Sequence, residues 1–169
     1  ISKIKKKPSV FIANEFFDSV PIKQFEKKGD LWFEKFVNLV DSKKAKFFER
    51  KVDIKKIEKK LNFKISQNQN FIEYSELGHY YLKEISKIIK KNNGGLLLID
   101  YGYTHKKMKN TLQAISNHKF ANILSNIGNV DITHNISFEL FKKLIKQMGS
   151  LENNLTTQKE FLIKMGIKQ

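Results

Sequence analysis

The apolar positions near the start of the chain form a short strand-like run. Residues 9–13 read Ser-Val-Phe-Ile-Ala, are rich in β-forming side chains, and lie between Pro8 and the polar pair Asn14-Glu15. A run of this length and composition predicts a buried strand, whose carboxyl end leads directly into a polar cluster.

A helix followed by a second buried strand is predicted farther along. The helix has an apolar stripe at helical spacing, made of Tyr81, Leu82, Ile85, Ile88 and Ile89. Asn92-Asn93-Gly94-Gly95 is expected to end it, because glycine accepts the left-handed conformation of a helix end. Residues 96–100, Leu-Leu-Leu-Ile-Asp, are typical of a strand buried on both faces. Together they make half of a βαβ unit and predict an α/β fold.

Residues 22–52 have a different, β-rich pattern centred on Lys28-Gly29-Asp30. Residues 31–33 and 36–40 are candidate strands of a hairpin or small meander, so an antiparallel β insertion is predicted over residues 22–52. A short charged helix is expected over residues 53–61, followed by a loop over residues 62–70.

The C-terminal part is mostly polar from Tyr103 to Asp131, with three apolar side chains expected to be packed: Leu112, Ile115 and Phe120. Ser137 is predicted to cap a helix that Gly149 ends and whose apolar face is formed by Phe138, Phe141, Leu144 and Ile145. Thr157 and Glu160 form a capping-box signal for a last helix.

The net charge of +15 is weak evidence for a nucleic-acid partner. Only Arg50 among the 32 basic residues is an arginine, and the abundant Lys, Ile, Asn and Phe are what an AT-rich genome produces. Because phosphate and base recognition draws on the guanidinium fork, direct nucleic-acid binding is not expected. The chain lacks cysteine, which excludes disulfides and thiolate metal sites. No apolar stretch approaches the ~20 residues that span a bilayer.

The length of 169 residues and a hydrophobic fraction of 40% suit one domain, or a large piece of one, with a real core. The chain begins at Ile1 and stops at Gln169 without a tail. We interpret it as an excerpt of a longer protein.

Two polar clusters follow the two predicted buried strands, at residues 14–21 and 100–103. In open α/β sheets, ligands bind outside the carboxyl ends of the strands, so both clusters are candidate sites. A purely structural role is the alternative for both clusters. In that interpretation Asp18 caps a turn, Asp100 caps a helix, and Phe16-Phe17 belongs to the core.

Other kinds of site have little support. The four histidines, His79, His105, His118 and His134, lack metal-ligand spacing, so no metal site is expected. A G-x-S-x-G elbow and a phosphate-binding glycine loop are both missing from the sequence. Hydrolase and nucleotide-triphosphatase functions are therefore disfavoured.

Residues 14–21, Asn-Glu-Phe-Phe-Asp-Ser-Val-Pro, resemble the Asn-Glu-Phe-Phe-Asp-Ala-Leu-Pro signature of the MidA family. Further blocks resemble this family in its own order over nearly the whole chain. They are Glu73-Tyr74-Ser75, residues 98–103, Thr111-Leu112-Gln113-Ala114, Asn117-His118-Lys119, Asp131-Ile132-Thr133 and residues 157–162.

The resemblance implies the central-to-C-terminal part of a class I, Rossmann-like methyltransferase fold, with S-adenosyl-L-methionine as the methyl donor. For the mitochondrial member it implies dimethylation of an arginine on a complex I subunit during assembly. The glycine-rich loop and the acidic residue that hold the cofactor are expected upstream of Ile1, and the last sheet strands beyond Gln169. The chain over residues 1–169 is thus a partial methyltransferase domain, expected to bind cofactor poorly and to be inactive alone.

The resemblance and the chemistry of a guanidinium together assign candidate roles. Glu15 and Asp18 are expected to grip the substrate arginine, because carboxylates match its forked donors. Asn14 and Glu15 are candidates for cofactor contact. Asp100, Tyr101 and His118 are further site candidates, for which hydrogen bonds that order loops are the alternative role.

Two hypotheses from different classes follow. The first is a protein-arginine methyltransferase that serves respiratory-complex assembly, cytoplasmic if bacterial and mitochondrial if eukaryotic. The second is a non-catalytic basic module that keeps the methyltransferase-like fold for binding or scaffolding. Steep salt dependence of polyanion binding favours the second.

Overall fold

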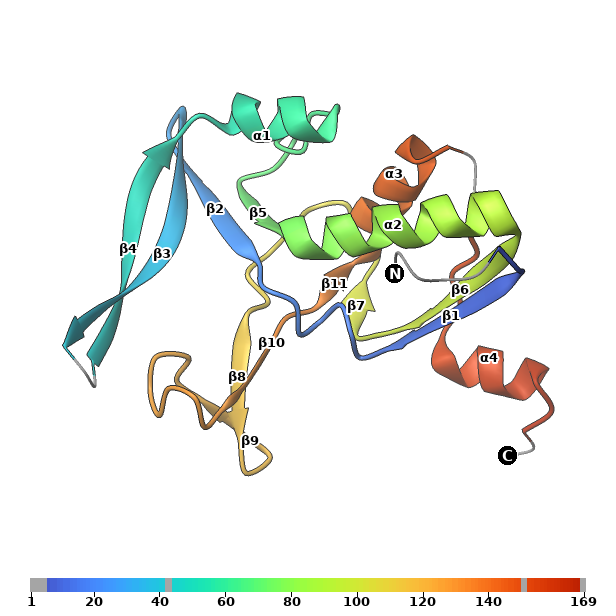
Figure 1. Ribbon diagram of the computed structural model, residues 1–169. Helices are drawn as coiled ribbons and strands as arrows, with labels where there is room; N and C mark the ends of the chain where they lie inside the picture. The colour runs from blue at the N-terminus through green and yellow to red at the C-terminus, as the bar shows by residue number, and fades with distance from the viewer. Residues whose placement is uncertain (1–5, 42–43, 150–151, 168–169) are drawn as a thin grey trace.

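The computed structural model describes residues 6–41, 44–149 and 152–167. Two parallel strands, β1 (Ser9–Asn14) and β6 (Gly94–Ile99), lie side by side, and helix α2 (Glu76–Asn92) packs along one face of them (Figure 1). Leu82, Ile85 and Ile89 of α2 are buried. The predicted strand, helix and second strand are confirmed, and the fold is α/β.

The two ends of α2 differ in how closely they follow the prediction. Ser75 is the N-cap, and its hydroxyl accepts a hydrogen bond from the Gly78 N–H at 2.9 Å. At the other end Asn93 has a φ of 60°, and β6 already begins at Gly94. The helix therefore ends within the predicted stretch, but asparagine rather than glycine supplies the positive φ at its C-cap. Gly94 is needed for close approach, since a Cβ there lies 2.0 Å from the carbonyl oxygen of Ser9.

An antiparallel sheet occupies the region predicted to be β-rich. Its strands, in sheet order, are β4 (Lys44–Val52), β3 (Leu31–Asp41), β2 (Lys23–Lys28) and β5 (Phe71–Tyr74). The predicted division of residues 31–40 into two strands is wrong, because β3 is continuous. Its charged residues Glu34 and Lys35 face Lys23 at 3.9 Å and Glu26 at 2.8 Å, so cross-strand ion pairs accommodate them within the strand.

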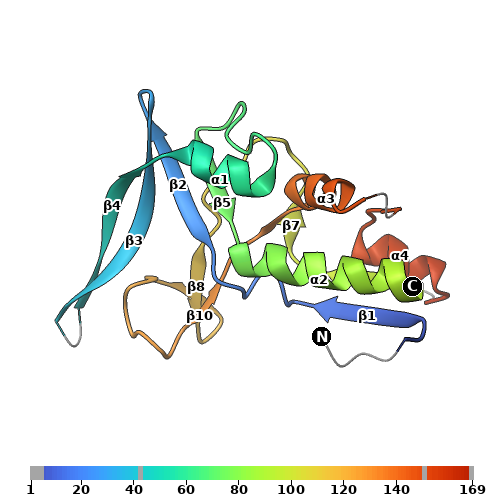
Figure 2. The same cartoon turned by 45° about the horizontal axis from the view of Figure 1, so that its top comes forward.

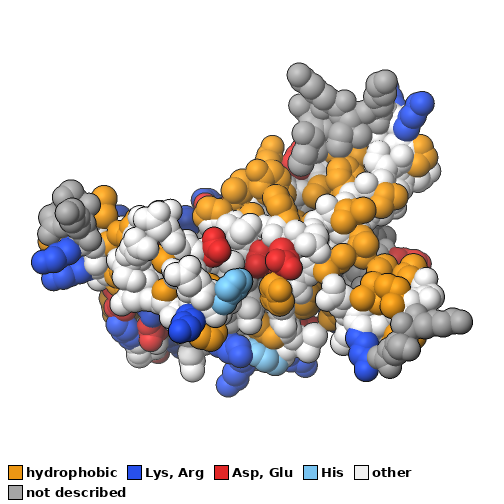
Figure 3. All heavy atoms as spheres, turned by 90° about the horizontal axis from the view of Figure 1, so that it is seen from below, with side chains coloured by type: hydrophobic (Ala, Val, Ile, Leu, Met, Phe, Trp, Pro, Cys, Tyr) orange, Lys and Arg blue, Asp and Glu red, His pale blue; other side chains and the backbone are white. Residues whose placement is uncertain are grey.

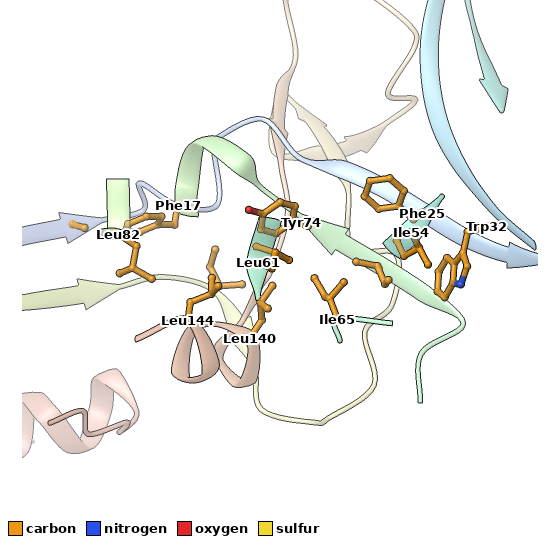
Figure 4. Packing of buried hydrophobic residues seen from close by; sticks show 13 residues of the cluster. Phe17, Phe25, Trp32, Ile54, Leu61, Ile65, Tyr74, Leu82, Leu140 and Leu144 are labelled. Carbon is orange, nitrogen blue, oxygen red and sulfur yellow. The ribbon is translucent and has the colours of Figure 1, made fainter. Parts of the chain in front are cut away.

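The hydrophobic core runs between the β1–β6 pair and the antiparallel sheet. Helix α1 (Ile54–Leu61) confirms the short helix predicted over residues 53–61, begins after the N-cap Asp53, and closes one side of the core. Figure 4 shows Phe17, Leu82 and Leu144 at one end and Phe25, Ile54 and Trp32 at the other, with Leu61, Tyr74 and Ile65 between them. One continuous core therefore ties the β1–β6 layer to the antiparallel sheet.

The region from Gly102 to Ser137 holds short strands that were not predicted. Strand β7 (Gly102–Tyr103) pairs in parallel with β11 (Ile136–Ser137). A small antiparallel sheet is formed by β10 (Asp131–Thr133), β8 (Gln113–Ser116) and β9 (Lys119–Ala121). Phe120 is 83% exposed, so the expectation that it is packed is wrong. Three-residue strands are too short to carry a readable alternation.

The two C-terminal helices are confirmed with their caps. In α3 (Phe138–Gln147), Ser137 accepts a hydrogen bond from Leu140, and Leu140 and Leu144 are buried. In α4 (Gln158–Lys164), Thr157 and Glu160 form the predicted capping box. No residue of α4 is buried among those that the structure describes.

Two surfaces are more exposed than the sequence suggests. Val10 and Ile12 of β1 are 76% and 70% exposed, so the prediction of a buried strand is wrong for β1. Strand β6 is only half-buried beyond Gly94, so the prediction of burial on both faces is wrong for β6. Figure 3, seen from the side away from α2, shows apolar side chains on that surface. The β3–β4 ribbon projects from the body (Figure 2). It also exposes apolar residues: Val37, Leu39, Val40, Phe47 and Phe48.

Candidate functional site

The carboxyl ends of β1 and β6 bring the two predicted clusters together. The strands are parallel and in register, with Asn14 beside Ile99, so the residues that follow them start at the same edge. The Glu15 N–H continues the ladder by donating to the Ile99 carbonyl at 2.8 Å. Glu15 has a φ of 46°, an uncommon conformation for a residue with a Cβ, and it turns the chain away from the strand direction.

Asp100 anchors this junction through backbone donors. Its Oδ2 accepts hydrogen bonds from the N–H groups of Phe17 at 3.0 Å and Asp18 at 3.3 Å, and its Oδ1 accepts one from Tyr101 at 2.9 Å. Asp100 is followed by strand β7, so the interpretation that it caps a helix is wrong. Its carboxylate instead orders the loop after β1, which is the loop-ordering alternative for this residue.

Asp18 is a buried acid at the centre of the same loop. It is 5% exposed, and its Oδ1 has no hydrogen-bond partner among the residues described. Burial raises the pKa of Asp18, the nearby charge of Glu15 raises it further, and His134 opposes both effects. Burial likewise raises the pKa of Asp100, with a further contribution from Asp18. Three carboxylates thus share a small region, and burial raises the pKa of two of them.

The outer side of the site is solvent-accessible. Asn14 and Glu15 are exposed, and Tyr101 is 61% exposed. The Tyr101 hydroxyl lies 3.4 Å from Glu15 Oε1, at the long limit of a hydrogen bond. Phe16 and Phe17 were considered as site residues or as core residues, and the structure gives them different environments. Phe17 is fully buried in the core, whereas Phe16 is 38% exposed and packs edge-on against Tyr81.

His118 lies apart from the other candidates. It is in the turn between β8 and β9, where Asn117 and His118 have φ values of 49° and 60°, and it is exposed. Two positive φ values in a two-residue hairpin loop are the geometry that matches the twist of the strands. The structure therefore assigns His118 a turn position, and the β8–β9 turn lies apart from the carboxyl ends of β1 and β6 (Figure 1).

His134 joins the site without having been singled out in the sequence. Its backbone N–H donates to the Asp18 carbonyl at 3.0 Å, the residue is 7% exposed, and its ring Nε2 has no partner in the described part of the chain. The ring lines a small cavity of about 30 Å³, whose wall includes Glu73, Tyr74 and Tyr103. The sequence offered only one signal for this role, the apolar Ile136 two residues after His134. The contact with Asp18 joins residues more than a hundred positions apart, so no local pattern could predict it.

The raised pKa of Asp18 predicts a gain in stability when its charge is removed. A carboxyl with a raised pKa in the folded state costs stability once it ionises, and this cost disappears as the pH falls below the ordinary aspartate value of 3.8. Asp18→Asn should raise Tm at pH 7.5 by about 2–4 °C, the shift that about 1 kcal/mol produces at this size. The comparison is made by thermal unfolding at pH 7.5 and pH 3.5.

The exposed Asp131 provides the control for this prediction, since Asp131→Asn removes the same charge from the surface. That variant should leave Tm nearly unchanged at both pH values. A lower Tm of Asp18→Asn at pH 7.5, or a gain of equal size at pH 3.5, contradicts the assignment of a buried repulsive carboxylate.

Comparison with known proteins then identifies the family. The model of a family of S-adenosyl-L-methionine-dependent methyltransferases matches residues 1–157. The chain belongs to this family. The resemblance inferred from the motifs of residues 14–21 and 98–103 is thereby confirmed.

Relatives of this methyltransferase-family chain include mitochondrial proteins. It is 31% identical over 162 residues to the mitochondrial protein arginine methyltransferase NDUFAF7 homolog of Caenorhabditis elegans. This alignment covers 95% of this chain and 38% of that protein. It is 27% identical over 173 residues to the mitochondrial protein arginine methyltransferase NDUFAF7 of Xenopus tropicalis, over 94% and 36%. The chain therefore spans little more than a third of these relatives.

A solved structure supports the fold. A protein of Burkholderia thailandensis bound to S-adenosyl-homocysteine superposes with a TM-score of 0.67 at 16% identity, over 88% of this chain and 40% of that one.

In the described ranges, no three His, Asp or Glu side chains gather in a metal-binding arrangement. Among the described helices, none is long and apolar enough to cross a membrane.

Proposed function

We infer that this chain forms the substrate-gripping part of an S-adenosyl-L-methionine-dependent methyltransferase that acts on an arginine side chain of a protein. The observation that carries this inference is the cluster of Glu15, Asp18 and Asp100 at the joined ends of two parallel strands. Ligands bind at such strand ends in open α/β sheets. A concentration of negative charge there suits a cationic substrate.

Glu15 and Asp18 have different accessibilities and therefore different proposed roles. Glu15 is exposed, so its carboxylate is available to bind the forked N–H donors of an incoming guanidinium. Asp18 is buried, and its Oδ1 has no hydrogen-bond partner in the part of the chain that the structure describes. Contact between Asp18 and the substrate therefore requires a local opening of residues 15–19. Tyr101, beside Glu15, is placed to hold the glutamate in its binding orientation.

The residues at this edge also fit one end of the cofactor. When bound, S-adenosyl-L-methionine supplies a methyl group on a positively charged sulfonium, and its amino-acid end offers ammonium donors. Asn14 and Glu15 are exposed oxygen-bearing side chains at the end of β1, and both match donors of this kind. The family membership supports the same cofactor.

The chemistry needs a group that accepts one proton. A guanidinium nitrogen forms a bond to the methyl carbon as the carbon–sulfur bond breaks with its electron pair going to sulfur, and the nitrogen then loses a proton. Holding donor and nucleophile in this geometry is worth up to about 7–11 kcal/mol. Asp18 is the proposed acceptor of the proton, because burial and the charge of Glu15 raise its pKa, and a carboxylate with a raised pKa is a stronger base.

The wider assignments are part of the same proposal. The β1–β6 pair is proposed to belong to a class I, Rossmann-like sheet, with residues 22–52 as an antiparallel insertion and the cofactor-binding half elsewhere in the protein. The names of the relatives support a mitochondrial location in a eukaryote. We propose a cytoplasmic location in a bacterium, and a respiratory complex I subunit as the protein substrate in mitochondria.

The test uses the natural polypeptide that contains these residues. Binding of S-adenosyl-L-methionine is measured by calorimetry, and transfer of a labelled methyl group to an arginine-containing peptide is measured with varied peptide. Asp18→Asn should keep cofactor binding while lowering kcat about 100-fold, the contribution of a general base. Glu15→Gln should raise KM for the peptide about 10-fold, because it loses a charged acceptor.

Glu139→Gln is the control, since Glu139 pairs only with Lys142 on α3 among the ion pairs of the described residues. It should leave both parameters unchanged. A polypeptide that does not bind S-adenosyl-L-methionine contradicts the enzyme proposal. Salt-dependent binding of a polyanion by that same polypeptide supports the alternative of a non-catalytic basic module.

A further inference from the structure

Glu73 is a buried carboxylate for which the proposed reaction has no direct use. It lies in β5, where its neighbours Ile72 and Tyr74 are buried core residues, and it is 6% exposed. A carboxylate at such a position is costly unless several donors satisfy it. A side chain that breaks the apolar pattern of a core strand therefore calls for a specific explanation.

Four donors converge on the two oxygens of Glu73. Oε1 accepts from Gln24 Nε2 at 2.7 Å, from the Thr111 N–H at 2.9 Å and from the Leu112 N–H at 3.3 Å. Oε2 accepts from the Thr111 hydroxyl at 2.5 Å. Gln24 is itself buried and also donates to Asn110 at 2.8 Å. Glu73 thus fixes residues 110–112, a segment without regular structure of its own.

This segment in turn holds the strand that supports the candidate site. The Thr111 hydroxyl, which donates to Glu73, accepts the Asn135 N–H at 3.0 Å. On either side of Asn135, the N–H groups of His134 and Ile136 point to the candidate site. They donate to the carbonyls of Asp18 at 3.0 Å and Tyr101 at 2.8 Å, respectively.

The alternation of an extended chain explains this arrangement. Successive N–H groups point in opposite directions, so fixing the N–H of residue 135 on one side aims those of residues 134 and 136 toward the other. The two carbonyls that they reach belong to the loops after β1 and β6, the two halves of the site. One short segment therefore sets the separation of Asp18 and Tyr101.

We propose that Glu73 is a positioning residue, which acts through Thr111 and the extended segment 134–136. It keeps the loops that carry Asp18 and Tyr101 at a fixed separation. This inference rests on the proposed function for its catalytic consequence, but its structural content does not depend on it. Glu73 touches neither substrate nor cofactor. It acts only through the order that it gives to the two loops.

Amide hydrogen exchange of this chain, followed by NMR, tests the structural content. Glu73→Gln keeps the shape but turns an NH2 group toward donors. The amides of His134, Asn135 and Ile136 should then exchange about 10- to 100-fold faster, as loss of bonds to a charged acceptor implies. Amides of the β3–β4 ribbon should keep their rates. Thr111→Val should reproduce the effect, whereas Thr111→Ser, which keeps the hydroxyl, should restore slow exchange.

Glu58→Gln is a matched control, because Glu58 also accepts two hydrogen bonds in a loop, both from Ser66, away from the site. It should leave residues 134–136 unaffected. Unchanged exchange of these amides in Glu73→Gln overturns the proposal. Uniformly faster exchange throughout the chain overturns it as well, because Glu73 then contributes only to global stability.

Kinetics of the natural polypeptide test the catalytic consequence. Glu73→Gln should lower kcat for peptide methylation about 10-fold, with KM for S-adenosyl-L-methionine unchanged. If selective exchange is observed but the wild-type polypeptide transfers no methyl group, the proposed function fails while the positioning role stands. If the wild type is active and Glu73→Gln keeps full kcat despite selective exchange, the positioning role for the reaction is overturned.

Discussion

Asp100→Ala is expected to lower the free energy of unfolding by about 3 kcal/mol, because hydrogen bonds to a charged acceptor contribute about 1.5–3 kcal/mol each. Asp100 accepts three backbone N–H groups, from Phe17, Asp18 and Tyr101. Alanine leaves all three donors without this partner. Relief of the repulsion between Asp100 and Asp18 offsets part of the loss, which keeps the expected value near the contribution of one such bond. Urea unfolding at pH 7.5, monitored by circular dichroism, measures it.

Asp53→Ala is the comparison for this change. The Asp53 side chain also accepts a hydrogen bond from a backbone N–H, that of Lys55 at 3.0 Å. Asp53 differs from Asp100 in being an exposed N-cap. Its loss should cost about 1 kcal/mol. If Asp100→Ala is no more destabilising than Asp53→Ala, the three bonds do not hold the site together, and Asp100 is free for a direct role with a ligand.

Most secondary structure was predictable where local chemistry decides it. The caps at Ser137 and Thr157 and the stripe of α2 depend on side chains within one or two turns, and the structure confirms them. The small sheet of β8, β9 and β10 was missed, since its strands have only three or four residues and the pairing of β10 with β8 joins segments more than ten residues apart. The split of β3 failed for a similar reason, because the partners of Glu34 and Lys35 lie on another strand.

The candidate site was predictable in part. The strand pattern indicated Glu15, Asp18 and Asp100 as candidates because they follow buried strands. The parallel pairing of β1 with β6, which joins them at one edge, is a finding of the structure. The role of Asp100 as acceptor for the opposite loop was not predictable, because it depends on the path of that loop. His134 and Glu73 were missed because their partners, Asp18 and Thr111, are distant in sequence. His118 was grouped with the site by motif, whereas its turn conformation places it elsewhere.

The site therefore depends on the close pairing of β1 and β6, and Gly94→Ala tests that dependence. A Cβ at Gly94 lies 2.0 Å from the carbonyl oxygen and 2.9 Å from the carbonyl carbon of Ser9, and Gly94 has a φ of 150°. Backbone atoms cannot swing away as a side chain does, so the two strands must separate at this end. The free energy of unfolding should fall by about 3 kcal/mol or more, at the upper end of overpacking effects.

Gly95→Ala is the matched control, because the neighbouring glycine has no atom within 4 Å of its Cβ position in the described structure. It should change stability only slightly, and urea unfolding of both variants at pH 7.5 measures the difference. Separation of β1 from β6 also moves Asn14 away from Ile99, so Gly94→Ala should speed exchange of the Glu15 amide, which bonds to the Ile99 carbonyl. Equal stabilities for the two variants contradict the close approach at Ser9. A destabilised Gly94→Ala that keeps slow exchange at Glu15 shows instead that the strand ends at the site hold together independently of their beginnings.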